Sequence, residues 1–119
     1  MKVLGKPRGR VDGRAKVTGQ TRFADDVVLP RMLHLKLLRS PHPHALIESI
    51  DVEKAKAFPG VHLVLTGKDF PITFGILPVT QDEYPLAPRH VRYVGDPVAA
   101  VVAKDEQTAA EALELIEVK

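Results

Sequence analysis

The sequence predicts an α+β domain, in which several short strands and two helices share one hydrophobic core. Three observations lead to this class: period-two alternation of apolar residues in the middle of the chain, one long apolar run near its end, and two short segments with helical spacing. A length of 119 residues fits a single domain or part of one, and 45% of the positions are hydrophobic. Aromatic residues make up only 5%, so the core is expected to be aliphatic.

An extended basic arm is expected over residues 1–19, followed by the folded domain over residues 20–119. Glycines recur in 5–19 without apolar periodicity, which is typical of turns and extended chain. Residues 1–22 carry seven basic side chains and one acid, whereas 105–119 carry five acids and one lysine. The basic residues are spread among glycine, proline and valine, and no nucleic-acid motif follows. A solvated or partner-facing arm is therefore favoured over a nucleic-acid contact.

Strands are expected where apolar residues alternate. Residues 21–24 have the pattern of a short strand, and residues 33–37 that of a half-buried one. Two prolines within 40–44 must break the second strand, because proline donates no ladder hydrogen bond. Residues 45–50 resume the pattern, which indicates a hairpin-like return, and residues 61–65 form the next strand.

Two helices are expected, each opened by an aspartate. Asp51 is the candidate N-cap of a short helix that ends at Phe58, before Pro59. Asp105 is the candidate N-cap of a longer helix with Glu106 in its first turn. The second helix has apolar residues at i, i+3, i+4 and i+7, which form one stripe. They are Ala109, Ala112, Leu113 and Ile116.

The second half of the chain contains a long proline-marked segment, residues 70–88, without clear periodicity. It is either a functional loop or a piece that packs on something outside this chain. Residues 91–94 alternate as a strand, and 95–97 turn or bulge. The apolar run 98–103 suits a central strand that is buried on both faces. Residues 116–119 can begin another strand.

Several classes of protein are excluded by what the sequence lacks. There is no cysteine, so the chain offers no disulfide, iron–sulfur cluster, zinc ribbon or thiol nucleophile, and the default compartment is the cytoplasm. No uninterrupted apolar stretch of about 18 residues is present, and the N-terminus lacks the apolar region of a signal peptide. We therefore expect neither membrane insertion nor export.

Residues of catalytic types are present but do not form a known catalytic or metal-binding pattern. His42 and His44 could supply two imidazoles to a metal, with His34 in a neighbouring strand, yet no cysteine or helically spaced carboxylate joins them. Adjacent acids at 25–26 and 82–83 point to opposite faces of an extended chain, so they are expected in turns or caps. From its residues alone, the chain is a scaffold or interaction domain without an active site of its own.

Five segments, in order along nearly the whole chain, resemble the N-terminal α/β-hammerhead domain of the molybdenum-binding large subunit of the xanthine oxidase family. They are residues 10–19 (RVDGRAKVTG), 23–26 (FADD), 38–45 (LRSPHPHA), 58–61 (FPGV) and 92–101 (RYVGDPVAAV). Residues 74–78 and 81–87 further resemble the large subunit of 4-hydroxybenzoyl-CoA reductase. The family usually has glycine at the position of Arg31.

This resemblance implies an oxidoreductase whose large subunit holds a molybdenum–pterin cofactor, molybdopterin, and hydroxylates a carbon centre, or removes a phenolic hydroxyl in the 4-hydroxybenzoyl-CoA reductases. Its cofactor and catalytic residues lie in several hundred further residues, so the 119-residue chain alone is expected to be an inactive fragment or a separately encoded piece. We expect [2Fe–2S] clusters and FAD on partner subunits of a heteromeric complex, and no cofactor on this chain.

Candidate contacts with the rest of that complex follow from the same motifs. They are Arg10, Asp12, Arg14, Lys16, His42 and Asp96. In the arm, glycines permit close backbone approach and arginines can meet carboxylates. His42 and Asp96 are expected to fix a hairpin and the turn into the central strand. The competing hypothesis is a free-standing binding module that uses its basic arm to hold an acidic partner.

Overall fold

A computed structural model describes residues 4–119, which form two units: one ends at Pro30, and the other runs from Arg31 to Lys119. The first three residues of the expected arm lie outside the described residues. Within residues 4–30 there is a short helix α1 (Gly13–Val17) and a 3-10 turn η1 (Ala24–Asp26), and no residue is buried. This unit therefore has no hydrophobic core of its own. The division between arm and domain expected after residue 19 stays a prediction.

The strand expected over residues 21–24 is wrong, because this segment has no partner strand and η1 begins within it. The carboxylate of Asp26 accepts a hydrogen bond from the peptide N–H of Phe23 at 2.9 Å and closes the 3-10 turn. An aspartate that bonds its own nearby backbone favours such a turn over an extended ladder. The two acids at 25–26 thus lie in a turn, as expected.

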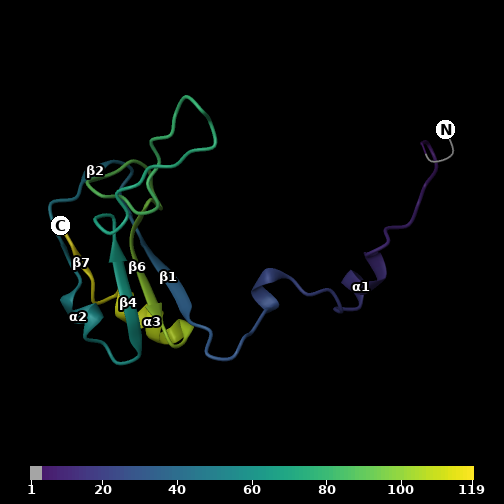
Figure 1. Ribbon diagram of the computed structural model, residues 1–119, viewed down its shortest axis with the longest axis horizontal. Helices are drawn as coiled ribbons and strands as arrows, with labels where there is room; N and C mark the ends of the chain where they lie inside the picture. Colours follow the sequence, from purple (N-terminus) through teal and green to yellow (C-terminus); the bar gives the residue numbers. More distant parts are fainter. Residues whose placement is uncertain (1–3) are drawn as a thin grey trace. The chain divides into compact units, whose positions relative to one another are not determined.

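The second unit is built on a three-stranded antiparallel sheet in the order β1 (His34–Arg39), β6 (Pro97–Ala103) and β4 (Val61–Thr66). Figure 1 shows these strands side by side. The central place of the apolar run in β6, and the two strands beside it, confirm the expectations from the sequence. A bulge between Leu38 and Arg39 lies opposite the start of β6.

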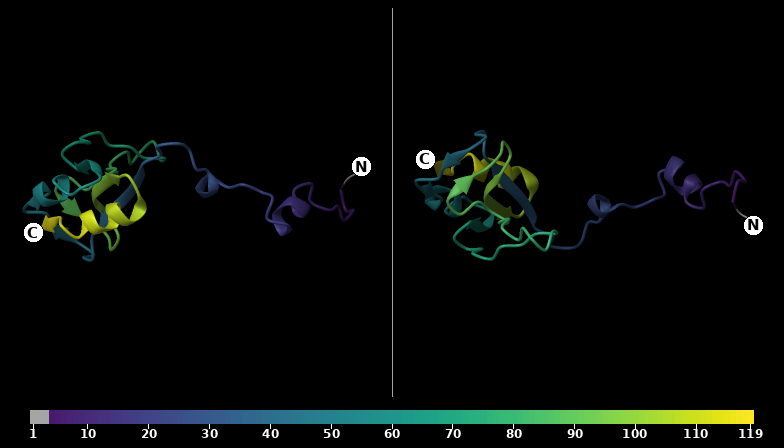
Figure 2. Two further views of the ribbon diagram at one scale, coloured as in Figure 1. Left: turned by 90° about the horizontal axis from the view of Figure 1, so that it is seen from below. Right: turned by 90° about the horizontal axis from the view of Figure 1, so that it is seen from above.

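One face of this sheet is covered by helices α2 (Glu53–Lys56) and α3 (Glu106–Leu113), and the two further views in Figure 2 show α3 along it. The buried residues at this interface alternate along β6 and recur with helical spacing on α3. They are Ala99, Val101, Ala103, Ala109, Ala112 and Ile116, packed with Val52, Ala55 and Val64. The many alanines let the helix approach the sheet closely, so the core is small and aliphatic, as the composition predicts.

Two short antiparallel pairs complete the unit: β2 (Ala45–Leu46) with β5 (His90–Val91), and β3 (Ile50–Asp51) with β7 (Glu117–Val118). The hairpin-like return expected for residues 45–50 is therefore wrong. The preceding strand is already paired along its length with β6, which offers a longer apolar ladder. Residues 45–51 instead pair with two segments that are distant in sequence.

The helix caps follow the prediction at one helix and differ at the other. The Asp105 carboxylate accepts a hydrogen bond from the Thr108 N–H at 2.7 Å, which confirms it as the N-cap of α3. Asp51 instead accepts from the N–H of Glu53 at 3.0 Å, while Val52 holds the cap position of α2, a helix shorter than expected. The α+β class is confirmed, with every described strand pairing antiparallel rather than mixed, and α1 as a third helix.

Arg31 has a φ of +62° and is, within residues 4–119, the non-glycine residue with a positive φ. This left-handed conformation favours glycine, because a Cβ crowds the following carbonyl there. The position is the one at which the resembled family usually has glycine. The turn geometry is thus retained although the residue differs.

Candidate functional site

The turn into β6 is organised around Asp96, a predicted contact residue that is only 8% exposed. Its carboxylate Oδ2 accepts a hydrogen bond from the peptide N–H of Arg92 at 2.9 Å. Its carbonyl accepts from the N–H of Ser40 at 2.9 Å, and the N–H of Gly95 donates to the carbonyl of Ser40 at 2.8 Å. Arg39 adds a guanidinium hydrogen bond of 2.8 Å to the carbonyl of Gly95. Asp96 therefore ties two distant turns together.

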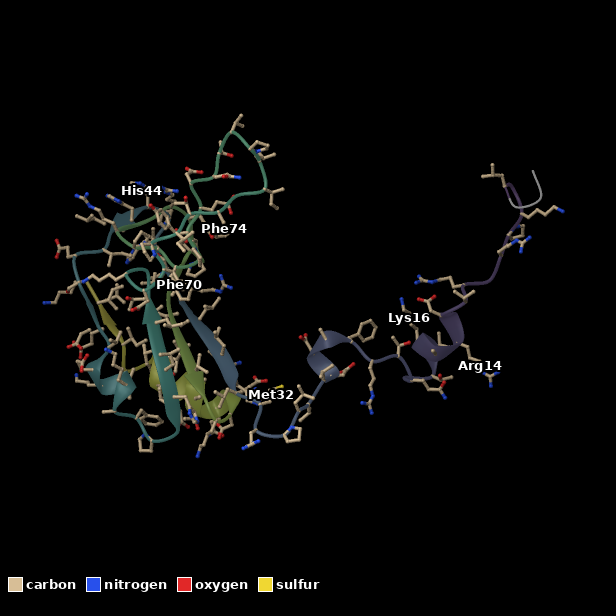
Figure 3. All side chains as sticks on the ribbon, in the orientation of Figure 1. Arg14, Lys16, Met32, His44, Phe70 and Phe74 are labelled. Carbon is tan, nitrogen blue, oxygen red and sulfur yellow. The ribbon has the colours of Figure 1, made fainter. Side chains whose placement is uncertain are left out.

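The histidines do not converge on one point. The peptide N–H of His42 donates to the hydroxyl of Ser40 at 3.0 Å, while its imidazole is exposed. The ring of His44, labelled in Figure 3, stacks on His90 of β5, with centroids 6.3 Å apart and an interplanar angle of 23°. His34 lies on β1. Among residues 4–119, no three histidine, aspartate or glutamate side chains form a group that could hold a metal ion.

Three of the four predicted contact residues in the arm form one ionic cluster on α1. Arg10 holds the Asp12 carboxylate with two hydrogen bonds of 3.0 Å, and Lys16 Nζ lies 2.9 Å from the same group. The hydrogen bond from Arg10, followed by that from Lys16, holds the pKa of Asp12 below its ordinary value. Arg14 forms no ion pair within the described part of the chain and leaves α1 in a different direction from Lys16 (Figure 3). Arg14 is thus the cation that the cluster leaves available.

Two hollows open on the second unit. A cavity of about 180 Å³ lies beside the Asp96 turn, and an apolar groove of about 380 Å³ lies beside β2 and β7. The cavity is lined by Tyr84, Ala87, Pro88, His90, Arg92 and Asp96. The groove is lined mainly by aliphatic side chains, among them Val91, Val98 and Val118. Neither set of lining residues includes a serine or cysteine beside a histidine, which a nucleophilic mechanism requires.

Sequence reasoning missed the contacts that bring the two turns together. Arg39 and Gly95 are distant in sequence, and no local pattern indicates their hydrogen bond. The same holds for Arg92, whose guanidinium lies 3.6 Å from the Asp82 carboxylate. The available signals were the adjacent Gly95 and Asp96, which predicted a turn but not its partner.

The described residues contain no helix of the length and apolarity that a membrane span requires.

Comparison with known proteins gives one consistent result. The family model described as "Aldehyde oxidase and xanthine dehydrogenase, a/b hammerhead domain" matches residues 18–119. The chain is 48% identical to a probable xanthine dehydrogenase polypeptide of Bacillus subtilis, over 98% of its own length and 16% of that protein. It is 43% identical to the carbon monoxide dehydrogenase large chain of Afipia carboxidovorans, over 97% of this chain and 15% of that one.

A solved structure of the Cu,Mo-CO dehydrogenase superimposes on the chain with a TM-score of 0.82 at 41% identity, covering 97% of this chain and 15% of the other. The chain thus corresponds to a small part of each of these longer proteins. The residues that it shares with them include the fold described above, from the end of the arm to β7.

Proposed function

Because the chain belongs to the a/b hammerhead domain family of aldehyde oxidases and xanthine dehydrogenases, we propose that it serves as this domain in the molybdenum-binding large subunit of an oxidoreductase. The observation that carries the proposal is the match over residues 18–119, supported by the fold similarity to the Cu,Mo-CO dehydrogenase. The chain spans 16% of the length of its relative from Bacillus subtilis. The catalytic part of the enzyme is proposed to lie in sequence beyond that match.

The residues of this chain do not fit the molybdenum cofactor. No group of three potential metal ligands occurs in residues 4–119. The cavity beside Asp96 presents a buried carboxylate, whereas a pterin phosphate needs N–H or cationic donors. The apolar groove is lined mainly by aliphatic groups that cannot orient a polar cofactor. We therefore assign no catalytic step to this chain, and its proposed role is to hold subunits or domains in register.

The role of each predicted contact residue follows from this assignment. Asp96 and His42 act on the domain itself, because their polar groups bond the backbone of the two turns. Arg10, Asp12 and Lys16 fix the conformation of α1 through their ionic cluster. Arg14 is the residue proposed to meet a carboxylate on the surrounding enzyme.

The proposed subgroup is the 4-hydroxybenzoyl-CoA reductases, in which the net reaction removes a phenolic hydroxyl. The support is the likeness of residues 74–78 and 81–87 to that large subunit. The proposed partners are an iron–sulfur subunit with [2Fe–2S] clusters, an FAD subunit and the remainder of the molybdenum-binding subunit, in the cytoplasm. The lack of cysteine in this chain is consistent with clusters held elsewhere.

Purification of the native assembly through a tag on this chain tests the proposal. We expect the assembly to contain a molybdenum-binding polypeptide, and to reduce 4-hydroxybenzoyl-CoA with a low-potential donor. Oxidation of xanthine or an aldehyde instead would retain the family-level proposal and overturn the subgroup. Recovery of the chain on nucleic acid, with binding that weakens steeply as salt rises, would favour the free-standing binding module.

A further inference from the structure

The segment between β4 and β5 exposes a group of large apolar side chains that the proposed function leaves unexplained. They belong to residues 70–84, called here the 70–84 loop, which Figure 1 shows projecting beyond the strands. The exposed fractions are 40% for Phe70, 74% for Ile72, 50% for Phe74, 96% for Ile76, 61% for Leu77 and 87% for Val79. A contiguous apolar patch of this kind on a soluble domain marks an interaction surface.

The loop is held in one conformation by its own backbone. Phe74 and Glu83 exchange two peptide hydrogen bonds, of 2.9 and 3.1 Å, which close its base. Near the tip, the N–H of Thr80 donates to the carbonyl of Leu77 at 3.1 Å. Gly75 lies so close to this turn that a Cβ there would sit 2.5 Å from the Thr80 carbonyl oxygen. A structured loop with exposed aliphatic groups loses little entropy on binding.

The charges of the loop indicate what it binds. Its charged side chains are Asp82 and Glu83, and no basic residue occurs between residues 69 and 88. Arg92 lies 3.6 Å from Asp82, whereas Glu83 forms no ion pair within residues 4–119. The loop is therefore apolar at its tip and acidic at its base.

This arrangement favours a protein partner over the two other candidate occupants. An anionic lipid surface attracts basic segments and would repel these acids. A second copy of the loop would bring Asp82 and Glu83 of both copies together, which like-charge repulsion disfavours. An apolar pocket with lysine or arginine at its rim matches both parts of the loop.

We propose that the 70–84 loop anchors this domain by inserting Ile76, Leu77 and Val79 into an apolar, basic-rimmed pocket of the protein that surrounds it in the assembly. The inference rests on the proposed function, which supplies that surrounding protein. Ile76 and Val79 are the anchors, because they are the most exposed side chains of the loop. Glu83 meets the basic rim, and the hydrogen bonds of Phe74 set the height of the tip.

Site-specific photo-crosslinking in the cells that produce the protein tests the anchor. The probe is the native assembly carrying Leu77→p-benzoylphenylalanine, and the control carries the same group at Glu111, on the exposed side of α3. We expect the Leu77 probe, and not the control, to crosslink to a polypeptide surface whose apolar residues are flanked by lysine or arginine. Adding Ile76→Asp should lower the crosslink yield by about tenfold or more, since a central apolar anchor is lost.

The charge of the rim has its own test. Glu83→Gln should lower the yield less than Ile76→Asp and should reduce its dependence on salt concentration. Both changed side chains are exposed, so the thermal midpoint of each variant should equal that of the unaltered chain. Crosslinks to lipid, to the same loop of a second copy, to an acidic surface or to nothing would overturn the inference, as would a yield that Ile76→Asp leaves unchanged.

Molybdenum analysis of the same preparations separates the inference from the proposed function. Molybdenum in the assembly without the expected crosslink would refute the anchor and leave the proposed function standing. The expected crosslink in an assembly without molybdenum would support the anchor and refute the proposed function.

Discussion

Replacing Asp96 by alanine should destabilise the domain, because this carboxylate caps the turn that leads into the central strand. The side chain is 8% exposed, and its Oδ2 accepts the Arg92 N–H at 2.9 Å. A hydrogen bond to a charged group contributes roughly 1.5–3 kcal/mol to stability, and its removal leaves the Arg92 N–H without this partner. We therefore expect the free energy of unfolding to fall by about 2 kcal/mol. Asp96→Asn keeps an acceptor oxygen and should cost about 1 kcal/mol.

Thermal unfolding followed by circular dichroism measures this effect. For a domain of this size, about 2 kcal/mol corresponds to a fall in the thermal midpoint of roughly 8–16 °C. Asp82→Ala is the control, since that carboxylate is exposed and forms a surface ion pair of 3.6 Å; its midpoint should change by no more than a few degrees. An Asp96→Ala chain that melts like the unaltered one, yet lowers the molybdenum content of the assembly, would show that Asp96 contacts cofactor or partner rather than fixing the turn.

Three further changes test the packing and the cap. Gly67→Ala would place a Cβ 2.5 Å from the Pro88 Cα and should cost about 2 kcal/mol, measured as a lower urea midpoint. Val101→Ala removes two methyl groups from a fully buried side chain and should cost about 2–3 kcal/mol in the same assay; a cost below about 1 kcal/mol would contradict the core described above. The hydrogen bond from the Thr108 N–H lowers the pKa of Asp105 below its ordinary 3.8, so its stabilising effect is present above that value and is lost as pH falls through the folded-state pKa. Urea unfolding at pH 7 and pH 3 should therefore show a larger loss of stability for the unaltered chain than for Asp105→Asn, and equal losses would contradict this cap.

The elements that the sequence predicted well are those with a strong local pattern. The apolar run of β6 and the cap of α3 are confirmed because each depends on neighbouring residues alone. Residues 45–50 were correctly expected to be extended, but their partners were not, because period-two alternation does not identify the strand across the ladder. Helix α1 was missed since it is short, begins at a glycine and buries no apolar face.

The candidate site was less predictable, because its contacts join turns that are far apart in the chain. A turn at Gly95 and Asp96 followed from their residue types, yet the bonds to Arg39 and Ser40 depend on the sheet register. The stacking of His44 on His90 depends likewise on the β2–β5 pairing. The bulge that brings Arg39 to this turn has no local signal.

The molybdenum content of the isolated chain and of the assembly purified through it tests the central claim most directly. The account predicts no molybdenum on the 119-residue chain alone and a stoichiometric amount in the assembly, because the described residues form no site for the cofactor. Stoichiometric molybdenum on the isolated chain, or a native assembly that contains none, would contradict it.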